Sequence, residues 1–103
     1  MVYTVYMGFE WDKVKSESNV KKHGVTFNIA ITAFDDPYAL LAPDPRHSTL
    51  REKREWLIGE SDAGVLVVVF TRREEGKVWR LISARPANKQ ERRIYEATKE
   101  FPL

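Results

Sequence analysis

Apolar residues recur along the chain in patterns typical of strands, once near the N-terminus and repeatedly in the second half. Between residues 5 and 11 large apolar side chains alternate with other residues, and this period of two predicts a short half-buried strand. Further strands are predicted over residues 38–42, 53–59, 65–71 and 77–84, the last three at hairpin spacing. The segment 65–71 is apolar on both alternating faces, so we expect a central strand covered on both sides.

Two helices are predicted in the first third of the chain. Asp12 is an N-cap residue before a polar, helix-permissive stretch, and Gly24 is a typical C-terminal stop, which together predict a helix over residues 13–23. Thr26 is a second N-cap residue. The helix that follows, over residues 27–34, has apolar side chains at positions i, i+3, i+4 and i+7, so we expect one face to pack against a core.

A third helix is predicted after the last strand. Pro86 ends that strand, and Asn88 with Glu91 three residues later has the pattern of a capping box. The side chains expected to face inward are Ile94, Ala97 and Phe101. The order of elements predicts an α+β fold: an antiparallel meander sheet with two N-terminal helices and one C-terminal helix. The helices would cover one face of the sheet and leave the other partly open.

Composition narrows the class of protein without assigning a function. The 103 residues, 43% hydrophobic and 31% charged, predict one globular domain over residues 1–103. The absence of cysteine excludes disulfides, thiolate metal sites and a cysteine nucleophile. The N-terminus lacks the features of a signal peptide and no apolar run reaches membrane-spanning length. We therefore expect a cytoplasmic protein that makes no membrane contact.

Charge is informative through its distribution. Lys and Arg number 17 against 15 Asp and Glu, and a net charge of +2 does not by itself predict nucleic-acid binding. Between residues 85 and 93, however, several cations surround the single acid Glu91. They are Arg85, Lys89, Arg92 and Arg93. A local basic face is therefore predicted near the third helix.

Lys22 and His23, at the end of the first predicted helix, are the first candidates for chemistry. Histidine takes or gives a proton near neutral pH, and lysine can hold a phosphate oxygen. The structural alternative is that cations at a helix C-terminus stabilise the helix by roughly 0.3–1 kcal/mol. The two residues alone leave both interpretations open.

Two arginines of the last predicted strand are further candidates. The period of two places Arg80 and Arg85 on opposite faces of this strand. Arg85 follows the end of the strand and would project from the rim, whereas Arg80 would face the open side or be buried beside an acid. The alternative for each arginine is a structural salt bridge. The acids considered as partners are Glu52, Glu55 and Glu60.

Other cations would gather by strand pairing or on the third helix. Arg54 begins one predicted strand and Arg73 follows its neighbour, so antiparallel pairing would bring them together, a cluster that suits a polyanion. Simple solvation at a sheet edge is the alternative. On the third helix Tyr95 lies beside Arg92 and Arg93, a combination typical of single-stranded RNA binding, although a helical tyrosine also serves packing.

Other chemistries find little support. HExxH, EF-hand, Walker and GxGxxG motifs are absent, and His23 and His47 are the two histidines of the chain, so we expect neither a metal nor a cofactor. Trp11, Trp56 and Trp79 all lie in segments that resemble strands. Core packing is expected for each, with a base-stacking platform as the alternative.

The order and spacing of several short motifs between about residues 9 and 96 resemble the BrnT toxin family. The motifs are Phe9-Glu10-Trp11-Asp12, Asn19, Lys22-His23-Gly24-Val25, Asp36-Pro37, Ile58-Gly59 and Ile82-Ser83-Ala84-Arg85. The resemblance implies a RelE-like fold and a ribonuclease that inhibits translation until a cognate antitoxin, BrnA, neutralises it. It also implies a heterotetramer formed through antitoxin dimerisation, with DNA bound only through the complex.

The resemblance further implies RNA cleavage without a metal, with the 2′-hydroxyl of the substrate as nucleophile. His23 would act as general base or acid, Lys22 and Arg80 would hold the phosphate, and Glu52 would be a reserve proton carrier. The expected catalytic set is Lys22, His23, Glu52, Arg54 and Arg80. The expected RNA contacts are Arg73, Arg85, Arg92, Arg93 and Tyr95.

Three classes of function stay open at this point. The first is a ribonuclease toxin, the second a non-catalytic module that binds RNA or the antitoxin on the same fold, and the third an inactive structural relative. A catalyst would lose its rate abruptly on substitution of single residues, whereas a binding module would lose affinity gradually. A structural protein would have its arginines paired with acids.

Overall fold

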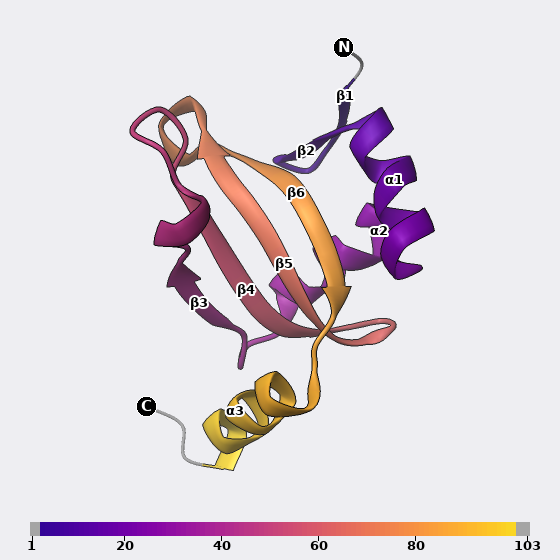
Figure 1. Ribbon diagram of the computed structural model, residues 1–103, viewed down its shortest axis with the longest axis vertical. Coiled ribbons are helices and arrows are strands. Elements are labelled where there is room, and N and C mark those ends of the chain that lie inside the picture. Colours follow the sequence, from indigo (N-terminus) through magenta and orange to yellow (C-terminus); the bar gives the residue numbers. More distant parts are fainter. Residues whose placement is uncertain (1–2, 101–103) are drawn as a thin grey trace.

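A six-stranded sheet forms the centre of the fold, with helices behind it, beside it and beyond the ends of its strands (Figure 1). The computed structural model describes residues 3–100. The strands are β1 (Tyr3–Tyr6), β2 (Phe9–Asp12), β3 (Leu40–Pro43), β4 (Arg54–Ser61), β5 (Gly64–Arg73) and β6 (Val78–Pro86). The helices are α1 (Lys13–His23), α2 (Phe27–Ala30) and α3 (Lys89–Glu100). Short 3-10 turns are η1 (Ile31–Asp35), η2 (Pro45–His47) and η3 (Glu74–Gly76).

The sheet is mixed, which corrects the expectation of a wholly antiparallel one. Its strand order is β1-β2-β6-β5-β4-β3, and the strands from β3 to β6 are consecutive antiparallel neighbours. The strand β2, however, pairs in parallel with β6, with Phe9 opposite Trp79 and Glu10 opposite Arg80. The α+β class is confirmed. The parallel pair places an N-terminal acid directly beside an arginine that is distant in sequence.

A tight turn divides the strand predicted over residues 5–11 into the hairpin of β1 and β2. Met7 and Gly8, the turn residues, have φ values of 49° and 86°. Two successive residues of positive φ match the right-handed twist of a hairpin. Glycine adopts this conformation freely, but methionine rarely does. The sequence Met7-Gly8 therefore has a typical turn residue at only one of the two positions, which is why it does not predict a hairpin.

The first predicted helix is confirmed with its caps. The carboxylate of Asp12 accepts a hydrogen bond of 3.0 Å from the backbone N–H of Val14. Gly24, at φ 70°, donates its N–H to the carbonyl of Val20 at 2.8 Å. The left-handed conformation at Gly24 turns the chain back towards the sheet.

The second predicted helix is shorter than expected. It is α-helical over α2 alone and continues as the 3-10 turn η1. The hydroxyl of Thr32 donates to the carbonyl of Ile29 at 2.6 Å, and such a local bond competes with the regular helical pattern. The apolar stripe nevertheless packs inward, with Phe27 and Ala30 fully buried.

Helix α3 presents a different face to the core from the one predicted. The capping box forms, since the backbone N–H groups of Asn88 and Glu91 each bond the other residue's side chain at 2.8 Å. Tyr95, however, is fully buried, whereas Ile94 is 52% exposed and Ala97 is also exposed. The expectation for Ile94 and Ala97 is therefore wrong, and Phe101 lies outside the described residues.

The Tyr95 hydroxyl determines this orientation, because it donates a hydrogen bond to the carboxylate of Asp36. Burial raises the pKa of Asp36, but the bonds from Tyr95 and from the backbone N–H groups of Glu60 and Tyr38 outweigh it, and the net pKa is lowered. Burial, and then the bond to Asp36, raise the pKa of Tyr95. The pair fastens α3 to the end of the sheet.

The two faces of the sheet differ. Helix α2 and turn η1 cover one face, and the core there contains, among others, Trp11, Phe27, Leu57, Val68, Phe70 and Leu81. A smaller cluster on the other face, with Ile58, Val67, Ala87 and Tyr95, lies towards α3. None of the helices within residues 3–100 has the length and apolar character needed to cross a membrane.

Asn19 joins α1 to the edge of β6. Its carboxamide nitrogen donates to the carbonyls of Ala84 (2.8 Å) and Val25 (2.9 Å), and its oxygen accepts from the N–H of Ala84 at 3.0 Å. Both backbone groups of Ala84 are thus paired by a side chain, as a neighbouring strand would pair them. Because Asn19 is buried, it holds α1 beside β6 in one position.

Replacing Asn19 by Ala is expected to lower the free energy of unfolding by roughly 2–4 kcal/mol, because buried backbone groups would lose their partners. Urea unfolding followed by circular dichroism measures the loss. Asn28→Ala, an exposed asparagine in α2, is the matched control and is expected to change stability little. A loss at position 19 no larger than that at position 28 would contradict the role of the bridge.

Candidate functional site

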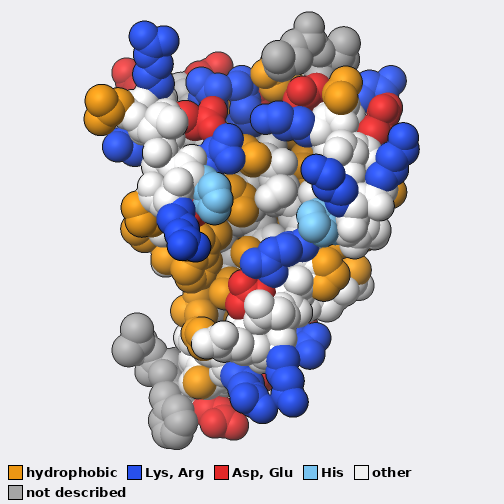
Figure 2. Space-filling view, in the orientation of Figure 1, with side chains coloured by type: hydrophobic (Ala, Val, Ile, Leu, Met, Phe, Trp, Pro, Cys, Tyr) orange, Lys and Arg blue, Asp and Glu red, His pale blue; other side chains and the backbone are white. Residues whose placement is uncertain are grey.

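The open face of the sheet carries a cleft of about 460 Å³ between η2 and β6 (Figure 2). Its lining is Asp44, His47, Arg54, Trp56, Ile58, Val67, Val69, Ile82, Ser83, Arg85, Glu91 and Ile94. Two smaller recesses adjoin it through Ile82, which lines all three. The cleft and these recesses together are called the open-face cleft below.

A β-bulge in the sheet determines which side chains of β6 reach the open-face cleft. Val69 pairs with Ser83 and Phe70 pairs with Leu81, so Ile82 is an extra residue on β6. Ile82 and Ser83 therefore both line the main part of the open-face cleft, while Leu81 is almost fully buried in the core.

The bulge overturns the strict period of two predicted for this strand. Arg80 and Arg85 were expected on opposite faces, but both line the open-face cleft, Arg80 in one recess and Arg85 in the main part. The extra residue between them reverses the alternation of side chains. Two cations predicted to be separate are thus brought to one surface.

The two histidines of the chain approach the same stretch of β6 from opposite sides. His47, in η2, lines the main part with Ile82 and Ser83, and His23, at the end of α1, lines a recess with the same two residues. Lys22 lines that recess too. Figure 2 shows the histidines on either side of the hollow. Lys22 and His23 are therefore both at the site.

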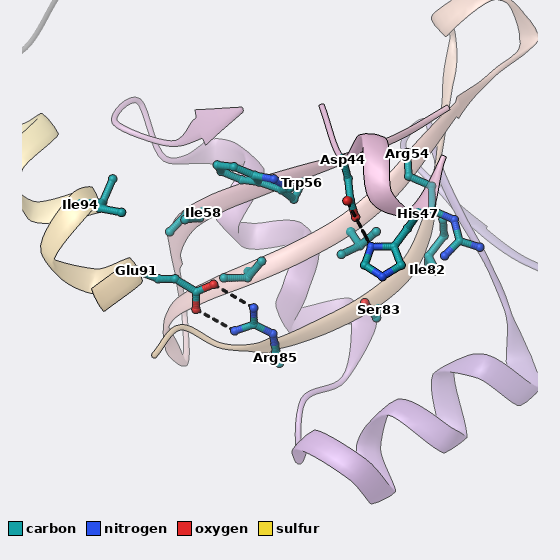
Figure 3. A pocket seen from close by; sticks show the side chains of 12 residues that line it. Asp44, His47, Arg54, Trp56, Ile58, Ile82, Ser83, Arg85, Glu91 and Ile94 are labelled. Atoms are coloured by element: carbon teal, nitrogen blue, oxygen red, sulfur yellow. Dashed lines mark hydrogen bonds and ion pairs between the residues drawn. The ribbon is translucent and has the colours of Figure 1, made fainter. Parts of the chain in front are cut away.

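His47 was missed as a candidate by the sequence reasoning, which predicted only a loop around it. Its Nδ1 lies 2.9 Å from a carboxylate oxygen of Asp44, and Figure 3 shows the pair at one end of the cleft. A Pro45 at the first position of the turn brings Asp44 and His47 together. The sequence feature that could have indicated this pair is an aspartate three residues before a histidine, with Pro45 between them to favour a turn.

Glu52 connects the two arginines expected from strand pairing. Its carboxylate accepts a hydrogen bond from Arg54 Nε at 2.8 Å and lies 3.9 Å from Arg73 Nη2. The hydrogen bond from Arg54, chiefly, and the charges of Arg54, Arg73 and Lys15 lower the pKa of Glu52 despite its partial burial. Glu52 is therefore ionised at neutral pH and is poorly suited to donate a proton.

Arg80 is paired with an acid that the sequence reasoning did not consider. Its Nε and Nη2 both lie 2.8 Å from one carboxylate oxygen of Glu10, its neighbour across the parallel β2–β6 pair. Its guanidinium also lies over the ring of Tyr3, 4.5 Å from the centroid. Glu55, one of the acids considered, is instead paired with Arg72 at 2.8 Å.

Arg85 and Glu91 form a two-point ion pair at the other end of the cleft (Figure 3). The Nη1 and Nη2 atoms of Arg85 lie 2.7 and 2.8 Å from the two carboxylate oxygens. The bonds to Arg85 lower the pKa of Glu91, although partial burial acts to raise it. The bonds to Glu91 raise the pKa of Arg85, although partial burial acts to lower it. The edge of the guanidinium that carries Nη1 and Nη2 is therefore occupied by the carboxylate of Glu91.

The expected RNA contacts on α3 lie apart from the open-face cleft. Arg92 and Arg93 are exposed and line a shallow recess on α3 itself, and Figure 2 shows basic side chains gathered at this end of the molecule. Tyr95 is fully buried, so its ring is inaccessible to an RNA base. That expectation is corrected, because the hydroxyl of Tyr95 is directed to Asp36 in the interior.

The open-face cleft thus combines proton-carrying, cationic and apolar groups. Two histidines flank it, Lys22 and four arginines line or border it, and Trp56 with several aliphatic residues forms its floor and walls. Such a surface suits a polyanion that also carries flat apolar groups. Within residues 3–100 no group of three or more His, Asp or Glu side chains is placed to hold a metal ion.

The fold and the site define an α+β protein with a histidine- and arginine-lined cleft. A family model described as the ribonuclease toxin BrnT of type II toxin–antitoxin systems matches residues 11–91, well over half of the chain. The chain belongs to this family of ribonuclease toxins. Family membership implies an antitoxin partner. A search of curated proteins gave no significant match.

The Arg85–Glu91 pair predicts a pH dependence of stability. Because the pKa of Glu91 is lowered in the folded state, its carboxylate contributes stability above its ordinary value of 4.5. That contribution is lost as the pH falls through the lowered pKa that Glu91 has in the folded protein. The stability gap between the parent and Glu91→Gln is therefore expected to be constant from about pH 6 to 8 and to shrink below about pH 4.5.

Thermal unfolding at a series of pH values measures this gap. Glu96→Gln, an exposed acid on the same helix, is the control and is expected to follow the parent at every pH. A gap for Glu91→Gln that stays the same at acid and neutral pH would show that the carboxylate is not stabilised by Arg85.

Proposed function

We propose that this ribonuclease toxin cleaves RNA in the open-face cleft without a metal ion, using the 2′-hydroxyl of the substrate as nucleophile. The observation that carries the proposal is the placement of His23 and His47 on opposite sides of Ile82 and Ser83. Cleavage by this route needs one group to remove a proton and another to supply one. Two histidines facing one stretch of sheet meet that requirement.

In the proposed reaction the 2′-oxygen bonds to phosphorus and the bond from phosphorus to the 5′-oxygen breaks. His47 removes the 2′-hydroxyl proton, and His23 gives a proton to the departing 5′-oxygen. The contact between Asp44 and His47 Nδ1 supports the first role, because a carboxylate at Nδ1 orients the ring and leaves Nε2 as the base. The products are a 2′,3′-cyclic phosphate and a 5′-hydroxyl.

Cations beside the histidines would stabilise the charged phosphate during the reaction. We assign this role to Lys22, beside His23, and to Arg54, beside His47. Arg80 and Arg73 would contact the neighbouring phosphate. Arg54, Arg73 and their shared partner Glu52 are about a third exposed, and ion pairs of this kind contribute only about 0–1 kcal/mol, so a phosphate can replace Glu52. Arg80 and Glu10 are more buried, so a phosphate would share Arg80 with Glu10.

Inhibition of translation would follow from cleavage of messenger RNA in the cytoplasm, with the antitoxin covering the same basic face. In this proposal antitoxin dimerisation joins two toxins in a heterotetramer, and DNA is bound only by the antitoxin. The open-face cleft supports a shared surface for RNA and antitoxin, because its cations and its apolar walls suit an acidic, amphipathic protein segment as well as RNA.

His23→Ala and His47→Ala are each expected to lower the rate of RNA cleavage by about 100-fold to 10,000-fold, the usual effect of losing a proton-transfer group. Single-turnover cleavage of a labelled RNA measures the rate, and the thermal midpoint of each variant establishes that it is folded. Arg46→Ala, next to His47 in η2 but outside the lining of the cleft, is the matched control and is expected to cleave at the parent rate.

The same variants separate catalysis from binding. RNA affinity is expected to change little in His23→Ala and His47→Ala, because the cations remain. Parent-like cleavage by a folded double variant would rule out the proposed proton carriers. RNA binding by the parent without any cleavage would instead favour a non-catalytic binding module.

Metal independence has its own test. Purified toxin treated with EDTA and assayed in EDTA is expected to cleave RNA at the rate seen without chelator. The 3′ fragment is expected to begin with a 5′-hydroxyl, which polynucleotide kinase can phosphorylate directly. Loss of activity in EDTA, with recovery on adding back a divalent ion, would overturn this part of the proposal.

A further inference from the structure

The part of the main cleft nearest α3, called the α3-end recess below, is lined by Trp56 and Ile58 on β4, by Val67 and Val69 on β5, and by Arg85 on β6. In the register of the sheet Trp56 on β4 lies opposite Val69 and Ile58 lies opposite Val67, and on the other side Val67 lies opposite Arg85 on β6. Neighbouring strands lie about 4.8 Å apart, so β4 and β6 are separated by about 10 Å. Val69 has the small Ser83 as its neighbour on β6, so Val67, Val69 and Ser83 leave space between Trp56 on β4 and Arg85, which lies diagonally across from it on β6.

Trp56 differs in its surroundings from the other tryptophans. Trp11 is buried in the larger core cluster and packs edge-on against Phe27, and Trp79 is partly buried against the same cluster and stacks on Phe70. Trp56 is half-buried and lines the cleft, and Figure 3 shows its indole on the wall between His47 and Ile94. Core packing is expected for all three, and Trp56 does pack against the smaller cluster, but unlike the other two it also lines the cleft.

Arg85, on the opposite wall, has a fixed guanidinium. The two bonds to Glu91 engage one edge of the group and hold its plane, while 41% of the side chain is exposed. A guanidinium held by its edge keeps its flat faces available for stacking on a base. The pair with Glu91 thus makes Arg85 better suited to stacking than to binding a phosphate.

We propose that the α3-end recess binds one unpaired RNA base, stacked against Trp56 and the guanidinium of Arg85, and thereby selects single-stranded RNA. The inference rests on the proposed function, because it places the base beside the phosphate that His47 and Arg54 would contact. The cleft volume of about 460 Å³ is within the range of small-ligand sites, which supports a nucleotide-sized occupant. A base inside a duplex is already stacked and paired, so it cannot enter.

A short RNA with 2′-O-methyl groups tests the α3-end recess independently of catalysis, because it lacks the nucleophile. The single strand is expected to quench the fluorescence of Trp56, a signal that Trp56→Phe removes. In Trp56→Leu, affinity measured by anisotropy of the labelled strand is expected to fall between about 5-fold and 100-fold, the usual effect of losing one base–aromatic stack. The same sequence annealed to its complement is expected to bind more weakly than the single strand.

Two further variants make the test specific. Arg85→Lys keeps the charge but removes the flat guanidinium, and it is expected to weaken binding of the single strand although the charge is unchanged. Tyr38→Leu removes an exposed aromatic ring outside the cleft and is expected to bind as the parent does.

The outcomes distinguish this inference from the proposed function. Binding that depends on Trp56, without cleavage of unmodified RNA, would support the α3-end recess and contradict the ribonuclease proposal. Cleavage by the parent, with no quenching and with parent-like affinity in Trp56→Leu, would overturn the α3-end recess and leave the ribonuclease proposal standing. Equal affinity for single strand and duplex would also overturn it. The inference would likewise be overturned if Trp56→Leu weakened binding of the antitoxin but not of RNA, because this wall of the cleft would then belong to the protein partner.

Discussion

The contact between Asn19 and both backbone groups of Ala84 is the constraint on which the open-face cleft depends. Beyond its short parallel pairing with β2, β6 has no neighbouring strand on that side among residues 3–100, and one buried carboxamide takes the place of such a strand. The same residue fixes α1 against the sheet, so Lys22 and His23, one turn further along, lie beside Ile82 and Ser83. A structural hydrogen-bond bridge therefore positions the proposed chemistry.

The bulge on β6 is the second determinant of the site, and its extra residue, Ile82, lies two residues before Ala84 on the same strand. By adding Ile82 to the strand, it allows Leu81 and Ala84 to stay in the core while Ser83 and Arg85 face the cleft. Without the extra residue, Arg80 and Arg85 would lie on opposite faces, as simple alternation predicts. The bulge is therefore what gathers cations from both ends of β6 on one surface.

Local signals predicted local structure well, but they did not predict how distant segments meet. The caps at Asp12 and Gly24 define α1 because each acts within a few residues of itself. The bulge at Ile82, the parallel β2–β6 pair and the buried face of α3 depend on contacts far apart in sequence, which periodicity does not encode. His47 was missed for the same reason, since only the folded loop brings it opposite His23.

The residues that carry the family resemblance are mainly structural. Asn19 bridges, Gly24 ends a helix, and Asp36 accepts three hydrogen bonds. Gly59 passes so close to the carbonyl of Ala33 that an added Cβ would lie 2.7 Å from it. These positions specify the fold, and the fold in turn creates the cleft.

Charge alone would not account for the proposed binding of RNA in this cleft. Arg54, Arg73, Arg80 and Arg85 each lie within 4 Å of a carboxylate, so much of the local positive charge is already balanced in the free protein. The modest net charge of +2 agrees with this balance. In the proposed function a phosphate would share these arginines with their carboxylates, so RNA binding would depend on geometry and on apolar contact in addition to phosphate attraction. The half-buried Trp56 supplies apolar surface where the charges are most fully paired.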